Sequence, residues 1–239
     1  MKSDELTFKD TPFSQLIKES KYLVELRNEY AEKSAEQRRK AADYKYHSAI
    51  ASDIFYMTIG EEEESDEEKI GHAEILALAI DPEYAPAIAS IGSYEYIFGR
   101  KDEAMEYFLK FTELPETTED LFEIIEKAGD FLCDAKDYER AIRLYKVSIE
   151  RFPDNALFRN CLSYCYAKLN RFEDAIKEAR VSVKLQPENY YYLNDLGYTL
   201  IEAEQFDEAE EILEKAIEFS PPYYVCARNN LENLYKLKK

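Results

Sequence analysis

The residues that could do chemistry in this chain are few and widely spaced. Its two histidines, His47 and His72, lie in no His-Glu-x-x-His metal-binding pattern, and neither neighbours a candidate nucleophile. Cys161 and Cys165 are spaced to share one helical face, but they would supply at most two of the four ligands that a structural zinc site needs. No Gly-rich phosphate loop and no nucleophile-elbow motif occurs. We therefore predict that the protein is not an enzyme and uses no metal or cofactor.

A second chemical feature is aromatic. The stretch YYYLNDLGYTL, residues 190–200, carries four tyrosines within nine residues. Tyrosine combines a large contact area with a polar tip, which suits a binding surface, but the same rings could form the packing face of a helix. The choice depends on whether this segment recurs in the chain, and in which register.

An acidic run, EEEESDEE at residues 61–68, is the densest cluster of charge. It lacks the alternating Asp/Asn spacing and the glycine of a calcium-binding EF-hand loop. We expect a solvated loop between helices. The functional alternatives are a contact for a basic partner and a phosphorylation site at Ser65.

Composition and charge limit the classes of partner. The chain has 239 residues, of which 46% are hydrophobic and 34% charged, as in a folded protein. Its net charge of −19 repels nucleic-acid backbones and anionic membranes, so we expect no nucleic-acid partner, whereas a basic protein or peptide is compatible with it. Because no signal-peptide core, membrane-spanning run or disulfide framework is present, we expect no membrane insertion and a cytoplasmic location.

The chain repeats itself at an interval of 34 residues. Three residue classes keep this period: prolines at 153, 187 and 221, alanines at 141, 175 and 209, and aromatic residues at 138, 172 and 206. In this register the repeat units are 85–121, 122–155, 156–189 and 190–223, preceded by a degenerate unit at 51–84. Such a period predicts a stack of similar structural units.

The pattern resembles the tetratricopeptide repeat (TPR), a helix–turn–helix of the same length. The residues that match it best are Leu193, Leu196, Gly197, Leu200, Phe206, Ala209, Leu213, Ala216 and Pro221. The sequence departs from the family at Ser163, where glycine is expected. The resemblance covers about residue 51 to the C-terminus and implies an all-α fold, a right-handed superhelical solenoid of helix pairs.

The two ends are predicted separately. Residues 224–239 have helical apolar spacing and a basic charge, which predicts a capping helix beside the acidic last unit. In residues 1–50 we expect helical segments that form an N-terminal cap or a further degenerate repeat. A specific docking or dimerisation helix is the alternative.

The resemblance also implies a concave groove lined by the second, fifth, ninth and twelfth residues of each first helix. From this stripe we predict a peptide-binding groove made of Glu123, Glu126, Asp130, Asn160, Tyr164, Tyr191, Asn194, Tyr198 and Arg228. An asparagine offers a donor and an acceptor to an extended peptide backbone, and tyrosine gives contact area with few rotors to freeze. The alternative is that these are ordinary solvated groove residues.

We therefore predict a non-catalytic adaptor or scaffold that binds a peptide or protein segment in this groove. Some family members clamp the C-terminal carboxylate of heat-shock chaperones with basic residues and asparagines. Matching positions here carry Ala89, Glu126 and Asp130, so we expect no such clamp. The alternative function is a self-assembling module, a homo-oligomer formed through the repeat ends or the cap helix.

Overall fold

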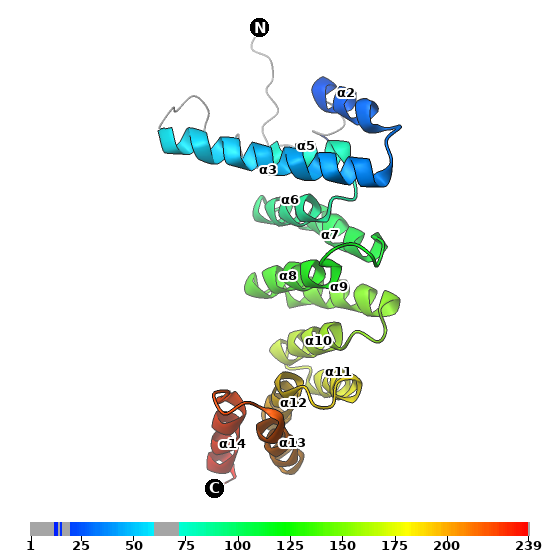
Figure 1. Ribbon diagram of the computed structural model, residues 1–239. Helices are drawn as coiled ribbons and strands as arrows, with labels where there is room; N and C mark the ends of the chain where they lie inside the picture. The colour runs from blue at the N-terminus through cyan, green and yellow to red at the C-terminus, as the bar shows by residue number, and fades with distance from the viewer. Residues whose placement is uncertain (1–11, 14, 16–19, 60–71, 239) are drawn as a thin grey trace. The chain divides into compact units, whose positions relative to one another are not determined.

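The computed structural model describes residues 12–13, 15, 20–59 and 72–238, and all the regular elements in these ranges are helices (Figure 1). In chain order they are α2 (Lys21–Tyr30), α3 (Ala35–Ile59), α5 (His72–Ile80), α6 (Ala85–Ile97), α7 (Lys101–Lys110), the 3-10 helix η1 (Phe111–Glu113), α8 (Leu121–Asp134), α9 (Tyr138–Arg151), α10 (Ala156–Lys168), α11 (Phe172–Leu185), α12 (Tyr190–Glu202), α13 (Phe206–Phe219) and α14 (Cys226–Leu237). The predicted all-α fold of helix pairs is confirmed. The acidic run at 61–68, with Ser65, lies outside the described residues.

The chain divides into two compact units, Met1–Ala128 and Gly129–Lys239, and the division falls within α8. None of the described helices is long and apolar enough to cross a membrane. The boundary that we placed between residues 50 and 51 does not coincide with a helix end, because α3 continues through it. The division into repeat units otherwise stays a prediction.

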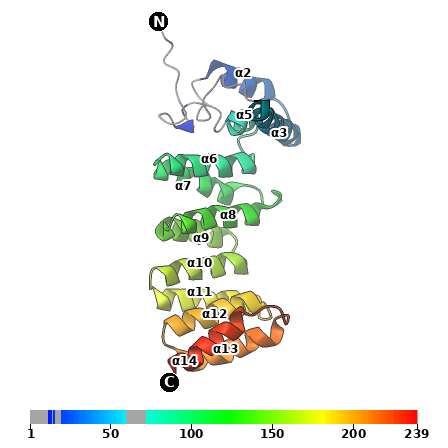
Figure 2. The same cartoon turned by 90° about the vertical axis from the view of Figure 1, so that its left-hand side faces the viewer.

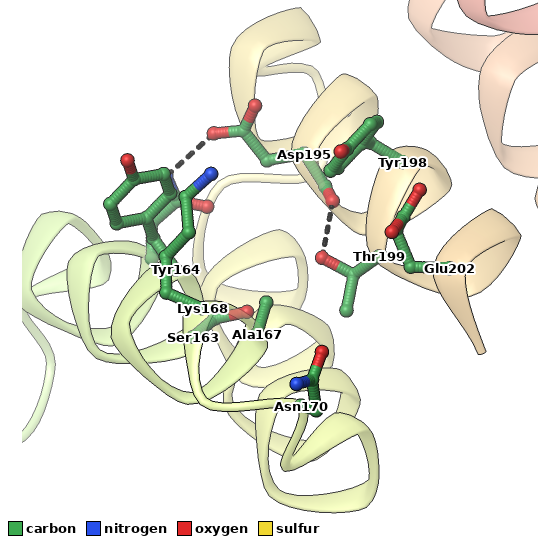
Figure 3. A pocket seen from close by; sticks show the side chains of 10 residues that line it. Ser163, Tyr164, Ala167, Lys168, Asn170, Asp195, Tyr198, Thr199 and Glu202 are labelled. Atoms are coloured by element: carbon green, nitrogen blue, oxygen red, sulfur yellow. Dashed lines mark hydrogen bonds between the residues drawn. The ribbon is translucent and has the colours of Figure 1, made fainter. Parts of the chain in front are cut away.

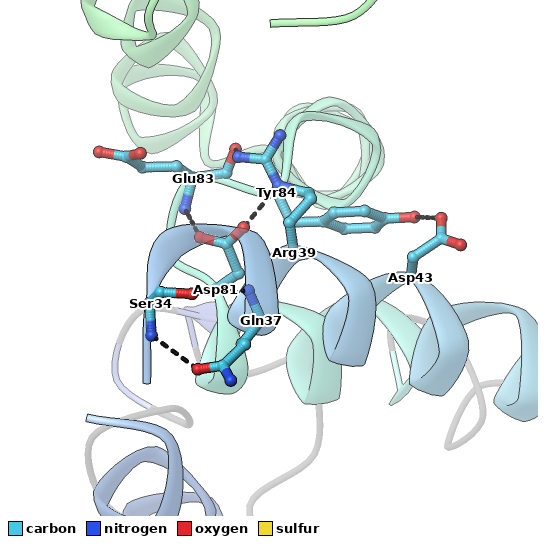
Figure 4. A network of polar contacts seen from close by, with 7 residues as sticks. All are labelled: Ser34, Gln37, Arg39, Asp43, Asp81, Glu83 and Tyr84. Atoms are coloured by element: carbon cyan, nitrogen blue, oxygen red, sulfur yellow. Dashed lines mark hydrogen bonds and ion pairs between the residues drawn. The ribbon is translucent and has the colours of Figure 1, made fainter. Parts of the chain in front are cut away.

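In the first unit, a polar network joins α3 to the connection between α5 and α6 (Figure 4). Arg39 Nε lies 2.6 Å from Asp81 Oδ2, and the Tyr84 hydroxyl group donates to Asp43 Oδ1 at 2.8 Å. The Asp81 side chain is buried, and the ion pair with Arg39 offsets part of the cost of removing its carboxylate from water. The network fixes α3 against the start of the next helix pair.

The N-terminal part of the chain also contributes to the first unit. The Phe13 side chain is fully buried, and its backbone N–H donates to Glu95 Oε1 at 2.7 Å. Its ring stacks on that of Tyr94, with 6.1 Å between the centroids. Glu95 is itself fully buried and pairs with Arg100. Phe13 therefore packs against α6.

The helices of the second unit follow one another as pairs with a repeated turn. Between the two helices of each pair, one residue adopts a left-handed conformation with φ of 58°: Lys136, Asn170 and Glu204, each 34 residues after the last. Asn155 and Asn189 keep the same interval, and their side chains accept from backbone N–H groups at the starts of α10 and α12. The sequence period is thus also a period in backbone geometry.

The packing of each pair depends on small residues where its helices cross. Ala141, Ala175 and Ala209 are fully buried at the same repeat position. On the facing helices, a Cβ atom at Gly129 would overlap the Tyr145 ring, and one at Gly197 would lie 2.6 Å from Leu213 Cγ. The last pair is covered by α14, which packs against α12 and α13 (Figure 2).

We expect Gly129→Ala to destabilise the protein by up to about 2 kcal/mol. An alanine gains about 1 kcal/mol of helix propensity. The overlap with the buried Tyr145 ring costs more than this gain, because overpacking a core costs about 1–3 kcal/mol. The aromatic ring is rigid and cannot bend away from the added methyl group. Urea unfolding measures the difference.

The matched control is Ser163→Ala, at the same position of the next pair, where a Cβ atom is already accommodated. We expect a change below about 1 kcal/mol for this variant. A Gly129→Ala protein as stable as the parent would show that the crossing can relax.

Candidate functional site

Three tyrosines of the predicted groove are exposed on the first helices of the second unit. Tyr164 on α10 is 49% exposed, and on α12 Tyr191 is 51% and Tyr198 43% exposed. On the opposite face of α12, Leu193, Leu196 and Leu200 are buried in the core. Because residues three and four apart share one helical face, this division leaves an aromatic stripe facing away from the core.

A hollow of about 290 Å³ lies between α10 and α12 (Figure 3). Its α10 side carries Asn160, Ser163, Tyr164, Ala167 and Lys168, and its α12 side carries Asp195, Tyr198, Thr199 and Glu202. A second hollow, of about 320 Å³, shares Asn160, Tyr164 and Asp195 with the first. It is otherwise lined by Asp130, Cys133, Asp134, Tyr145 and Cys161. The two hollows therefore adjoin each other, and together we call them the groove.

A chain of hydrogen bonds crosses three helices beneath this groove. Asn160 Nδ2 donates to Asp195 Oδ2 at 2.8 Å, and Asn194 Nδ2 donates to Asp195 Oδ1 at 3.3 Å. From α14, Asn230 Nδ2 donates to Asn194 Oδ1 at 2.9 Å. Asn194 is buried, and its amide is used within the protein. Both polar atoms of this amide therefore have partners within the second unit.

The residue that the sequence reasoning missed is Asp195. It does not fall on the predicted groove stripe, yet both hollows are lined by it. A sequence signal existed in the pair of adjacent polar residues, Asn194 and Asp195, which stands between Leu193 and Leu196. One of its two partners, Asn160, lies on another helix, so spacing alone could not identify it.

The cap and its neighbours hold two further predicted residues. Arg228 Nη1 donates to the carbonyl oxygens of Pro222 at 3.2 Å and Tyr224 at 2.9 Å, which fixes the segment before α14. The Tyr191 ring lies 4.3 Å from that of Tyr190 and 5.2 Å from that of Tyr224, measured between centroids. Tyr191 therefore belongs to an aromatic cluster near the cap.

The remaining acidic residues are distributed over both units. Glu123 and Glu126 belong to the first unit, where Glu123 Oε1 pairs with Lys127 Nζ at 2.6 Å. Asp130 belongs to the second unit and borders the second hollow. The structure therefore brings together Asp130, Asn160, Tyr164 and Tyr198 at the two adjoining hollows of the second unit. Glu123 instead borders a separate hollow of about 600 Å³ within the first unit, which Pro86 and Ala89 of α6 also line, and Glu126 lines none of these three hollows.

Two carboxyl groups of the groove titrate above their ordinary range. Partial desolvation raises the pKa of Asp195, and the hydrogen bonds from Asn160 and Asn194 oppose this shift without cancelling it. Desolvation and the nearby Asp134 raise the pKa of Asp130. The rings of the groove also attract cations, since Lys168 Nζ lies 4.9 Å from the centroid of Tyr164. The groove is suited to a positively charged group.

Two family models, both described as tetratricopeptide repeat, match residues 132–193 and 166–224. No curated protein matches the chain. Among solved structures, the chain is similar to YrrB, a TPR protein with an unusual peptide-binding site, at 18% identity over 93% of this chain and 98% of that one, with a TM-score of 0.52. MamA from Desulfovibrio magneticus RS-1 is 19% identical over 73% and 94% of the two chains, with a TM-score of 0.49. The Sgt2 TPR domain from Aspergillus fumigatus is 21% identical over 47% and 75%, with a TM-score of 0.44.

We expect Asn194→Ala to destabilise the second unit by about 1–3 kcal/mol, because it leaves the amide of Asn230 without its partner. Urea unfolding of single and double variants measures the effect. If the hydrogen bond carries the loss, the double variant Asn194→Ala/Asn230→Ala is less destabilised than the sum of its parts. Strict additivity would mean that the two amides do not interact in solution.

Proposed function

This chain is a tetratricopeptide repeat protein, and we propose that its second unit binds an extended peptide segment of a partner protein in the groove between α10 and α12. The observation that carries the proposal is the pair of exposed rings, Tyr164 and Tyr198, on either side of a hollow that contains Asp195. Exposed aromatic residues in a concave surface are costly to leave in water and favour a partner. In this proposal the protein is an adaptor without catalytic activity.

The size of the groove favours a peptide. Each hollow has the volume of a small ligand site, and the two adjoin at Asn160, Tyr164 and Asp195. Successive side chains of an extended strand point to opposite faces, so alternate side chains of one peptide, about 7 Å apart, can enter neighbouring hollows. YrrB, which has a similar fold, is a TPR protein with a peptide-binding site. This likeness concerns the fold, and the groove residues carry the assignment here.

The charge of the groove favours a basic peptide. Its lining contains the carboxylates Asp130, Asp134, Asp195 and Glu202, and one basic residue, Lys168. Lys168 already lies against the face of Tyr164, in the arrangement that a ligand lysine or arginine would adopt over Tyr198. We therefore propose a partner segment that carries at least one lysine or arginine.

The self-assembly alternative is supported less well. Self-assembly would depend on attraction between the basic cap of one copy and the acidic last helix pair of another. Within the chain, however, Lys238 Nζ lies 2.9 Å from Asp207 Oδ1 and 2.7 Å from Glu210 Oε2, and the Tyr235 hydroxyl group donates to Glu210 Oε1. Because these cap groups already have partners on their own α13, they are not available to attract a second copy.

The proposal is tested with peptides selected from a displayed library of random linear sequences against the full chain. We expect the selected peptides to contain lysine or arginine, and the variant Tyr164→Ala/Tyr198→Ala to bind them at least about tenfold more weakly, since each aromatic contact contributes about 1 kcal/mol. Calorimetric titration measures the affinity.

The matched control is Tyr223→Ala, which removes a ring that is 82% exposed and does not line the groove. Its affinity should equal that of the parent. Equal binding by parent and double variant, with the helical circular dichroism spectrum intact, would show that the peptide binds elsewhere.

Binding of a lysine- or arginine-containing peptide is expected to weaken as the pH falls from 7 towards 4, and also as salt is added. The pKa values of Asp130 and Asp195 are raised, so these groups gain a proton at higher pH than ordinary carboxyl groups and lose their attraction for the peptide. Affinity measured across pH should depend less on pH in Asp195→Asn than in the parent. An affinity that does not change in this range would exclude a direct charge contact.

A further inference from the structure

Two thiols face each other at the wall of the groove. Cys133, in the last turn of α8, and Cys165, on α10, have their sulfur atoms 3.5 Å apart. All four cysteines of the chain are free. The two residues are 32 positions apart in sequence, so the contact is made by the packing of the helices rather than by local spacing.

The two thiols differ in their access to solvent. Cys133 is partly exposed and lines the second hollow, whereas Cys165 is fully buried directly behind it. A small reagent that enters the hollow therefore meets the Cys133 sulfur first. The hydrogen bond with Cys165 also lowers the pKa of the Cys133 thiol, which favours its reactive thiolate form.

We propose that Cys133 and Cys165 form an oxidant-responsive thiol pair, a covalent modification site whose reagent is a small hydroperoxide. Cys133 is the residue that reacts with the reagent, and Cys165 is the residue that resolves the product. Formation of the disulfide bond changes the wall of the hollow that contains Tyr164.

The chemistry balances with one hydroperoxide per protein. The Cys133 thiolate attacks the terminal peroxide oxygen, and the O–O bond breaks. The hydroxide or alkoxide that is released takes up a proton and leaves as water or an alcohol. Cys133 is now a sulfenic acid. The Cys165 sulfur then attacks the Cys133 sulfur, the S–O bond breaks, and the thiol proton and the hydroxide leave as water. Two thiols are oxidised, and the peroxide is reduced.

The geometry favours this pair over the others. A disulfide bond has a length of about 2.05 Å, so the two sulfur atoms must approach by about 1.5 Å from their present contact. Cys161, the third thiol near the hollow, interacts instead with the hydroxyl group of Tyr145. Cys226 is exposed at the start of α14 and lies outside the groove.

A consequence for binding rests on the proposed function. Cys165 follows Tyr164 directly on α10, and Cys133 and Tyr164 line the same hollow. Closing the sulfur contact moves the end of α8 towards α10, so the oxidised protein should bind the selected peptides with altered affinity. The covalent step itself does not depend on any peptide.

The test treats the native full chain with one equivalent of hydrogen peroxide and counts free thiols after denaturation. We expect the number to fall from four to two and peptide mapping to find Cys133 joined to Cys165 within one chain, reversibly on addition of dithiothreitol. Cys133→Ser should retain its three thiols under the same treatment. Cys226→Ser is the matched control and should still form the bond.

Persistence of four thiols, or a bond between any other pair, would overturn the proposal. Because Cys165→Ala removes a buried side chain, Cys133→Ser, at a partly exposed position, is the primary variant, and its circular dichroism spectrum verifies the fold. Peptide affinity is then compared between oxidised parent and peroxide-treated Cys133→Ser. If the disulfide bond forms but the peptide affinity does not change, only the consequence for the groove is contradicted. If the reduced protein binds no peptide, only the proposed function is contradicted.

Discussion

The close crossing of the two helices in each pair is the constraint on which the second unit depends. Ala141, Ala175 and Ala209 are fully buried at this crossing, and Gly129 faces the ring of Tyr145 with no room for a Cβ atom. Helix axes can approach to about 8–10 Å only where the contacting side chains are small. The crossing fixes the rotation of each first helix, and that rotation decides which residues are left to face the groove.

A second constraint links one pair to the next. The hydrogen bonds from Asn160 to Asp195, between Asn194 and Asp195, and from Asn230 to Asn194 join α10, α12 and α14. Apolar packing between repeats is tolerant of small shifts, whereas these bonds have a narrow range of lengths and angles. Asp195 is partly desolvated to take part, and its raised pKa reflects that cost. We interpret this network of hydrogen bonds as the interaction that fixes the positions of α10, α12 and α14 relative to one another.

The sequence predicted the helices better than the site, for a physical reason. The 34-residue period arises from steric requirements that each pair repeats, so a stack of similar units could be predicted from residue types, and the all-α fold from the resemblance to the tetratricopeptide repeat. The predicted groove stripe identified which face of each helix its residues occupy, but not how far other helices bury each side chain. Asn194 was therefore predicted to meet a ligand, although α14 buries it. Asp195 was missed because its contact with Asn160 of α10 arises only when the helices pack.

The four tyrosines of residues 190–198 differ in how much of each ring the packing of the helices leaves exposed. Tyr192 is buried, and Tyr191 is held by the rings of Tyr190 and Tyr224 while half of it stays exposed. Tyr198 has no such ring contact among those described and stands at the hollow with Tyr164. A ring already held by its neighbours loses little conformational freedom when a ligand covers it. Because Tyr224 belongs to the segment that Arg228 fixes, the cap helps to hold the Tyr191 ring in place.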